Sequence, residues 1–113
     1  MFRRSVEFSR CIIPMSGFFE WSALKDKYYF TSMESKILMA AGIFRKDDDG
    51  TRFVMLTTAA NESMEQIHSR MPLLLEENQI AAWMGTYQEA QSLLGFTPLN
   101  LKKEIQGQLS LFS

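Results

Sequence analysis

The 113-residue chain has few of the residues that mark common functional sites, with one cysteine, one histidine and three prolines. The single cysteine, Cys11, excludes an intrachain disulfide and fits a reducing cytoplasm. The lone histidine has no Cys/His cluster beside it, so we expect no metal and no other cofactor. A Gly-rich phosphate loop and a Gly-x-Ser-x-Gly elbow are both missing, which leaves the reaction class open.

An excess of charge of one sign and long apolar runs are missing too. The formal net charge is −1, so any contact with nucleic acid must come from a local patch. No apolar run approaches the length of a membrane span, and the segment after Met1 lacks the apolar core of a signal peptide. The length and a hydrophobic content of 46% suit one compact domain.

The first half of the chain predicts strands and the second half predicts helices. Aromatic and branched residues indicate strands at residues 10–14, 17–21, 28–31, 37–44 and 52–58, with a hairpin at Asp49-Gly50. Helices are predicted from Asn61 to about Ile67, from Glu77 or Asn78 onward, and over residues 87–94. This order indicates an α+β domain over residues 1–101, followed by a polar, flexible tail over residues 102–113.

Glu20 is the first residue with chemical interest. Strand alternation places Phe18 and Glu20 on one face, and Phe19 and Trp21 on the other. A carboxylate beside aromatic neighbours can have a raised pKa and serve as a general acid or base. The alternative is an edge-strand glutamate facing solvent, and these residues by themselves favour that alternative.

His68 and Arg70 form the second point of interest. His68 could transfer a proton near neutral pH, or it could be a structural histidine bonded to a backbone carbonyl. The planar guanidinium of Arg70 would suit a phosphate, or it could form a surface ion pair with Glu76 or Glu77. The residue pattern leaves both pairs of alternatives open.

Four blocks of sequence, in this order, resemble the SRAP family, the SOS response-associated peptidases or abasic-site processing proteins. The blocks are residues 10–21 (RCIIPMSGFFEW), 40–44 (AAGIF), 56–61 with 67–72 (LTTAAN and IHSRMP), and 82–84 (AWM). The resemblance implies an α+β fold around a curved, mostly antiparallel sheet. It also implies that the N-terminal strands of that fold are missing here.

The same resemblance implies a sensor of abasic sites in single-stranded DNA that acts in the DNA-damage (SOS) response. In the family, a cysteine exposed as residue one attacks the lesion aldehyde with its amine and thiol, and the thiazolidine product is a DNA–protein crosslink. That cysteine is also proposed to drive self-cleavage of the leading methionine. Glu20 and His68 match the catalytic glutamate and histidine of the family, and Arg70 and Thr57 match positions that hold the DNA backbone.

The start of the chain departs from the family pattern. It begins Met1-Phe2 instead of Met-Cys, and the Asn-Ala-Arg-x-Glu block of the family has no counterpart. Cys11 matches an internal family cysteine, and its apolar strand predicts an inert thiol. We therefore expect the chain alone to be inactive in crosslinking. We also expect exposed edges that lower its stability or that a homo-oligomer covers. The alternatives are a non-catalytic clamp- and DNA-binding module and an inactive gene fragment.

The end of the chain resembles the pentapeptide with which bacterial proteins bind the sliding clamp of replication. Leu109, Leu111 and Phe112 would enter an apolar cleft, and Gln108 would supply a directional hydrogen bond. The alternative is that the chain end docks on its own domain. The expected partners are thus single-stranded DNA with an abasic site and the clamp, with no membrane, in a cytoplasmic, nucleoid-associated protein.

Overall fold

The computed structural model describes residues 9–106, and residues 1–8 and 107–113 lie outside the described range. Eight strands and two short helices make an α+β fold in which every strand pair is antiparallel, as expected. In chain order the elements are β1 (Arg10–Met15), β2 (Phe18–Trp21), β3 (Lys27–Ser32), β4 (Leu38–Asp47), β5 (Gly50–Met55), β6 (Thr57–Ala59), β7 (Arg70–Pro72), α2 (Glu77–Trp83), α3 (Tyr87–Gln91) and β8 (Leu101–Gln106).

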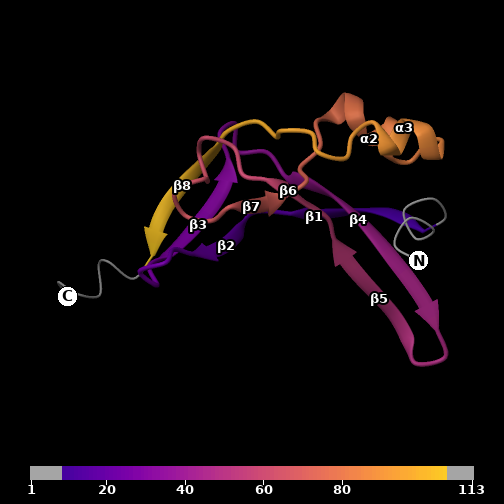
Figure 1. Cartoon of the computed structure of the whole chain (residues 1–113), viewed down its shortest axis with the longest axis horizontal. Helices are drawn as coiled ribbons and strands as arrows, with labels where there is room; N and C mark the ends of the chain where they lie inside the picture. The colour runs from indigo at the N-terminus through magenta and orange to yellow at the C-terminus, as the bar shows by residue number, and fades with distance from the viewer. Residues whose placement is uncertain (1–8, 107–113) are drawn as a thin grey trace.

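The strands form three small sheets, with the orders β1-β4-β5, β2-β3-β8 and β6-β7. Figure 1 shows β2, β3 and β8 at one end of the molecule, the two helices at the other, and the β4–β5 hairpin projecting away from both. The hairpin turns at Gly50, whose φ of 124° is open to glycine and strained for other residues. The hairpin predicted at Asp49-Gly50 is therefore confirmed.

Strand β4 supplies side chains to two separate hydrophobic cores. Ala41 and Ile43 belong to the core beneath the helices, whereas Leu38 and Ala40 belong to the core beside β3. The first core consists of Ala41, Ile43, Leu56, Leu73, Leu75, Trp83, Ala90 and Leu93. The second core consists of Phe30, Leu38, Ala40, Met64, Met71, Leu74 and Leu101. Because both cores draw on β4, its buried residues form an almost continuous apolar run.

The single strand predicted over residues 52–58 is wrong, because the chain changes sheets at Leu56. Strand β5 ends at Met55 and β6 begins at Thr57. The N–H of Leu56 donates to the Ala41 carbonyl at 3.0 Å, and its carbonyl accepts from Leu73 at 2.9 Å. Leu56 is thus buried where the two sheets meet. Because it is apolar like its neighbours, the sequence does not indicate that one strand ends and another begins there.

The helix predicted from Asn61 to Ile67 is also wrong, since residues 62–67 form consecutive turns. The Asn61 carbonyl accepts from both Met64 and Glu65, at 3.1 and 2.9 Å, so bonds to the third and fourth residues are mixed. The Asn61 side chain accepts from the Ser63 N–H at 3.0 Å, which is the bond of a capping residue. The capping bond of Asn61 therefore begins a turn that does not continue as a helix. The third predicted helix exists as α3 but ends at Gln91 instead of residue 94.

The boundary predicted at residue 102, between the domain and the tail, falls inside a strand. Residues Leu101–Gln106 form β8, which pairs with β3 along its whole length. Most β8 side chains are exposed, and this gives the segment a polar sequence although its backbone is bonded in a sheet. The residues of the predicted clamp motif, Gln108, Leu109, Leu111 and Phe112, lie outside the described residues. Over residues 9–106, no helix is long and apolar enough to cross a membrane.

Candidate functional site

Arg70 is held against Thr57 across the β6–β7 ladder. Its Nη2 donates to the Thr57 carbonyl at 2.9 Å and to Thr57 Oγ1 at 3.1 Å, and its Nε lies 3.3 Å from the same hydroxyl. These bonds replace the ion pair with Glu76 or Glu77 that the sequence offered as an alternative. Arg70 and Thr57 are both exposed. A guanidinium fixed on one side and open to solvent on the other is prepared to bind an anion.

His68 uses one ring nitrogen to hold its position. Nδ1 lies 3.2 Å from the Arg70 N–H, which donates to it, and 3.1 Å from the Arg70 carbonyl. The neutral ring can accept from the N–H through Nδ1, and the protonated ring can donate to the carbonyl from the same atom. In both protonation states Nδ1 is therefore engaged, and Nε2 is the atom that can reach a ligand. His68 is exposed, so this backbone bond orients a histidine that remains accessible.

Buried polar groups fasten the turn that carries His68. Asn61 is 6% exposed, and its amide donates to the carbonyls of Pro98 and Leu99, both at 3.0 Å. Ser63 adds a bond, because its hydroxyl accepts from the Leu101 N–H at 3.0 Å. The sequence predicts Asn61 only as a helix cap, and these long-range bonds could not be found from its local pattern. They tie the turn to the start of β8.

Glu20 lies on the same side of its sheet as the His68 turn. The predicted alternation is confirmed, because Phe18 and Glu20 are half-buried while Phe19 and Trp21 are exposed. Phe18 stacks on Phe30 of the second core with ring centroids 5.3 Å apart, and Ile67, next to His68, packs against that core. Phe18, two residues before Glu20, and Ile67, next to His68, therefore contact the same core.

The structure does not join Glu20 directly to His68 or Arg70. Within residues 9–106, no hydrogen bond or ion pair links the glutamate to either residue. Its Oε1 accepts a bond of 3.3 Å from the Trp21 N–H. Glu20 is thus a half-buried acid, and within residues 9–106 no hydrogen bond engages its second carboxylate oxygen.

Gly17 explains why a glycine precedes the Phe-Phe-Glu-Trp strand. A Cβ at this position would lie 2.6 Å from the Phe30 carbonyl oxygen and 2.6 Å from the Tyr29 ring. Such contacts are impossible without a shift of the β3 backbone. The glycine therefore lets β2 approach β3 closely enough to bring Glu20 opposite Tyr28.

Cys11 lies in a different sheet from the acid. Its place on β1 beside β4 leaves it half-buried, and burial raises the pKa of its thiol above the usual value. The Cys11 carbonyl also accepts the indole N–H of Trp83 at 2.9 Å. This environment agrees with the expectation of an inert thiol.

Arg10 has a role that the sequence does not reveal. Its guanidinium donates to the carbonyl of Gly85 and lies 6.0 Å from the Trp83 ring centroid. Arg10 thereby fastens β1 to the loop after α2, and its membership of the first sequence block has a structural reason. No three His, Cys, Asp or Glu side chains gather into a metal-binding cluster among residues 9–106.

Comparisons with known proteins agree with the sequence blocks. The family described as SOS response associated peptidase (SRAP) matches residues 1–106. Abasic site processing protein YoaM of Bacillus subtilis is 34% identical over 93 residues, which is 74% of this chain and 41% of that protein. An abasic site processing protein of Saccharomyces cerevisiae is 32% identical over 91 residues, which is 74% of this chain and 25% of that protein. The chain belongs to the SRAP family.

The fold comparison points in the same direction. A crystal structure of a protein from Bordetella bronchiseptica superposes with a TM-score of 0.75 at 20% identity, covering 92% of this chain and 58% of that one. The described strands and helices therefore form an SRAP-type α+β fold. The chain spans less than half the length of these two curated relatives.

Proposed function

We propose that this chain provides the Glu20, His68 and Arg70 side of a site that processes abasic lesions in single-stranded DNA. The observation that supports this most strongly is the His68–Arg70–Thr57 arrangement. It presents an accessible imidazole and an oriented guanidinium two residues apart. The relatives named abasic site processing proteins indicate the substrate class.

In this proposal Arg70 binds a phosphate beside the lesion, and Thr57 acts as its positioning residue. The guanidinium keeps its bonds to Thr57 on one side and offers its remaining N–H groups to phosphate oxygens. Such a contact carries no base specificity, which suits a lesion that has lost its base.

His68 and Glu20 transfer protons to and from the sugar and the attacking amine. His68 Nε2 donates a proton to the ring oxygen as the bond between that oxygen and C1 breaks. The C1 hydroxyl gives its proton to water in the same step, so the closed sugar opens to its aldehyde. An amine then adds to the aldehyde carbon, and Glu20 moves protons between nitrogen and oxygen until one water leaves and an imine remains. Addition of a thiol across the imine closes a thiazolidine, so the net change is loss of one water.

The amine and the thiol come from the terminal cysteine that the family resemblance implies. Cys11 is unsuited to this task, because it is an internal residue whose amine is part of a peptide bond. Its thiol is also held protonated by burial. Among residues 9–106 the chain thus supplies acid–base and phosphate-binding groups, and the nucleophile lies outside that range.

The proposal is tested with the protein in its native form, recovered from its own cells and mixed with an abasic-site oligonucleotide. A denaturing gel should show a heat-stable adduct. Glu20→Gln and His68→Ala should each slow adduct formation about a hundredfold or more, the usual contribution of general acid–base catalysis. Glu65→Gln, at an exposed position on the same turn as His68, is the control. Adduct rates that are equal in all four proteins would contradict the proposal.

We also propose that the tail docks on the bacterial sliding clamp through Gln108, Leu109, Leu111 and Phe112. The support is the sequence Gln-Leu-Ser-Leu-Phe, whose apolar side chains suit a cleft. Leu111→Ala with Phe112→Ala should abolish capture of the full chain by immobilised clamp, whereas Ser113→Ala should leave it unchanged. Equal capture of both variants would rule out this docking.

A further inference from the structure

The face of the β2-β3-β8 sheet opposite Glu20 carries a group of exposed aromatic rings. Strand alternation places Phe19, Trp21, Lys27 and Tyr29 on this face, because Phe19 pairs with Tyr29 and Trp21 pairs with Lys27. Phe19 is 45% exposed and Trp21 is 51% exposed. These rings are therefore outside both hydrophobic cores.

The exposed rings contact one another and a lysine. The ring centroids of Phe19 and Tyr29 are 4.7 Å apart, at a tilt of 37°. The Lys27 ammonium lies 4.3 Å from the Phe19 centroid and 5.3 Å from the Trp21 centroid. Mutual contact limits the freedom of these side chains, so the surface is ordered before any ligand arrives.

A polar hollow continues the same face beyond the rings. It has a volume of about 320 Å³ and is lined by Ser16, Thr31, Ser35, Lys36, Ile37, Lys102 and Glu104. Thr31 is two residues from Tyr29 on the same face of β3 and pairs with Lys102. The Ser16 hydroxyl lies 3.4 Å from the Tyr29 hydroxyl, which connects the hollow to the aromatic group.

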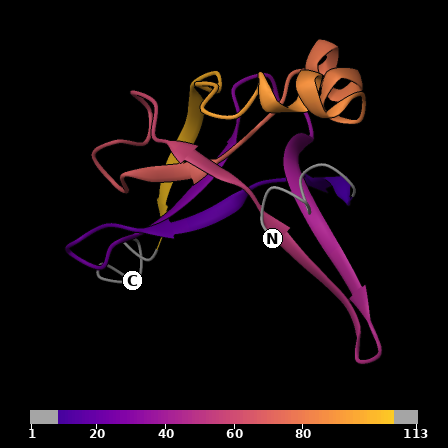
Figure 2. The same cartoon turned by 45° about the vertical axis from the view of Figure 1, so that its right-hand side comes forward.

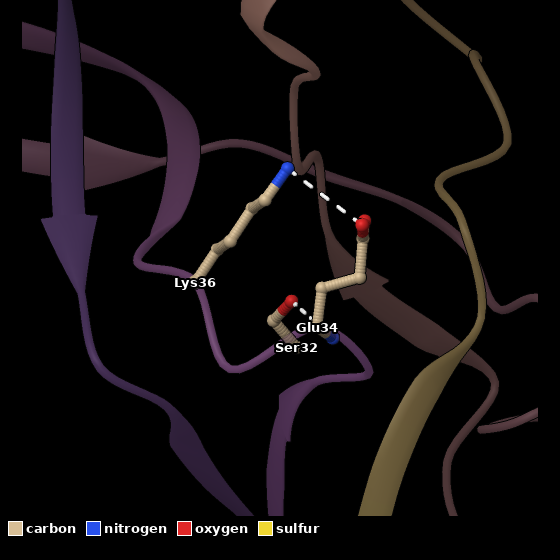
Figure 3. A network of polar contacts seen from close by, with 3 residues as sticks. All are labelled: Ser32, Glu34 and Lys36. Carbon is tan, nitrogen blue, oxygen red and sulfur yellow. Dashed lines mark hydrogen bonds and ion pairs between the residues drawn. The ribbon is translucent and has the colours of Figure 1, made fainter.

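The charges on this surface favour an anion. This surface carries three lysines (Lys27, Lys36 and Lys102) and two glutamates (Glu34 and Glu104). Its local charge is therefore positive, although the net charge of the chain is −1. Figure 3 shows the Lys36 ammonium facing Glu34, at 3.7 Å, and Lys102 is 3.6 Å from Glu104. Exposed ion pairs of this kind are weak, so a phosphate can replace either carboxylate.

We propose that this face binds single-stranded nucleic acid, with bases stacked on Phe19 and Tyr29 and the backbone at the lysines of the hollow. Ordered rings beside cations are the features of a stacking surface for single strands. Lysine is depleted at the centres of protein interfaces, which argues against a protein as the occupant. The inference extends the proposed function, because it gives the strand a second contact surface that needs no lesion.

The experiment measures fluorescence anisotropy of a labelled oligothymidylate without any abasic site. Phe19→Ala should weaken binding by the full chain roughly tenfold, as expected for the loss of one stacking ring. Met84→Ala is the matched control, because Met84 is 50% exposed at the end of α2, away from the rings. Lys36→Gln and Lys102→Gln should each reduce the slope of log affinity against log salt by about one.

Circular dichroism is used to check that each variant is folded, and the two lysine variants alter only exposed side chains. No binding of the oligothymidylate, equal affinities of Phe19→Ala and Met84→Ala, or unchanged salt slopes in both lysine variants would overturn the inference. A failure of the abasic-site proposal is distinguishable. In that case Glu20→Gln and His68→Ala leave adduct formation unchanged, whatever happens to binding of the intact strand.

Discussion

The two three-stranded sheets follow the same alternation rule and have different surroundings. The β2-β3-β8 sheet has one face covered by the His68 turn and a second face of ordered rings. The β1-β4-β5 sheet is covered by the helices near Trp83, but all six residues of β5 are exposed. Figure 2 shows this hairpin extending away from the rest of the fold.

The β2-β3-β8 sheet therefore has one covered face, whereas the outer strand of the β4–β5 hairpin is exposed on both faces. Phe53 and Val54 point to opposite faces of β5 and are 64% and 52% exposed. A free strand edge with apolar side chains on both faces is a surface that other chains or segments tend to cover. The homo-oligomer expected to cover exposed edges stays a prediction, and the β5 edge of the hairpin is one place to test it.

The largest expected effect concerns the covered end of the β1-β4-β5 sheet. Trp83 is completely buried and donates to the Cys11 carbonyl. Trp83→Ala leaves a large cavity beneath the helices and should lower the free energy of unfolding by about 3–5 kcal/mol. Denaturant unfolding followed by circular dichroism measures the change. Met84→Ala, at a neighbouring side chain that is 50% exposed, is the control and should change little. Equal losses in the two variants would show that the helices do not cover this sheet.

A smaller loss is expected on the other sheet, at the turn that carries His68. Asn61→Ala removes the donor for the Pro98 and Leu99 carbonyls and the acceptor for Ser63. Leaving these groups unpaired should cost about 1–3 kcal/mol in the same unfolding experiment. Exposed Asn78→Ala is the control. A stability equal to that of the control would mean that the turn does not depend on Asn61.

The sequence predicts local features of both sheets well, and the reasons are physical. The Glu20 face follows from alternation alone, and the Gly50 hairpin follows from its turn residues. The change of sheet at Leu56 and the pairing of β8 depend on long-range partners, and no local pattern encodes these. Residue chemistry brings His68 and Arg70 to attention, and the family resemblance assigns their roles. The hydrogen bonds that orient them are visible only in the fold.

Mutation of the exposed β4–β5 hairpin should change self-association and leave stability almost unchanged, whereas mutation near Trp83 should lower stability. Phe53→Ser removes an exposed apolar side chain and should change the unfolding free energy by only about 0.5 kcal/mol. It should also reduce self-association, as measured by sedimentation velocity over a range of concentrations. Thr51→Ser, on the same strand, is the control. A monomeric wild-type chain would refute the prediction that a second copy covers this edge.

The smallest effect is a pH dependence at the helical end. The backbone N–H and the hydroxyl of Thr86, which form a capping box with Glu89, hold the pKa of Glu89 below its usual value. Because the folded pKa is lower than the unfolded pKa, this stabilisation is present above about pH 4.5. It is lost as the pH falls through the folded pKa. Glu89→Gln should therefore flatten the decline in melting temperature on the acid side. An unchanged acid slope would contradict this.

The central claim is that the β2-β3-β8 sheet and the His68 turn hold the acid–base groups of an abasic-site reaction. Its most direct test is mass spectrometry of the adduct that the native protein forms with an abasic oligonucleotide. The account predicts a crosslinked polypeptide that begins with cysteine and contains Glu20 and His68, and an adduct that forms far more slowly with His68→Ala. Absence of any adduct from the native protein, or an adduct indifferent to His68, would contradict it.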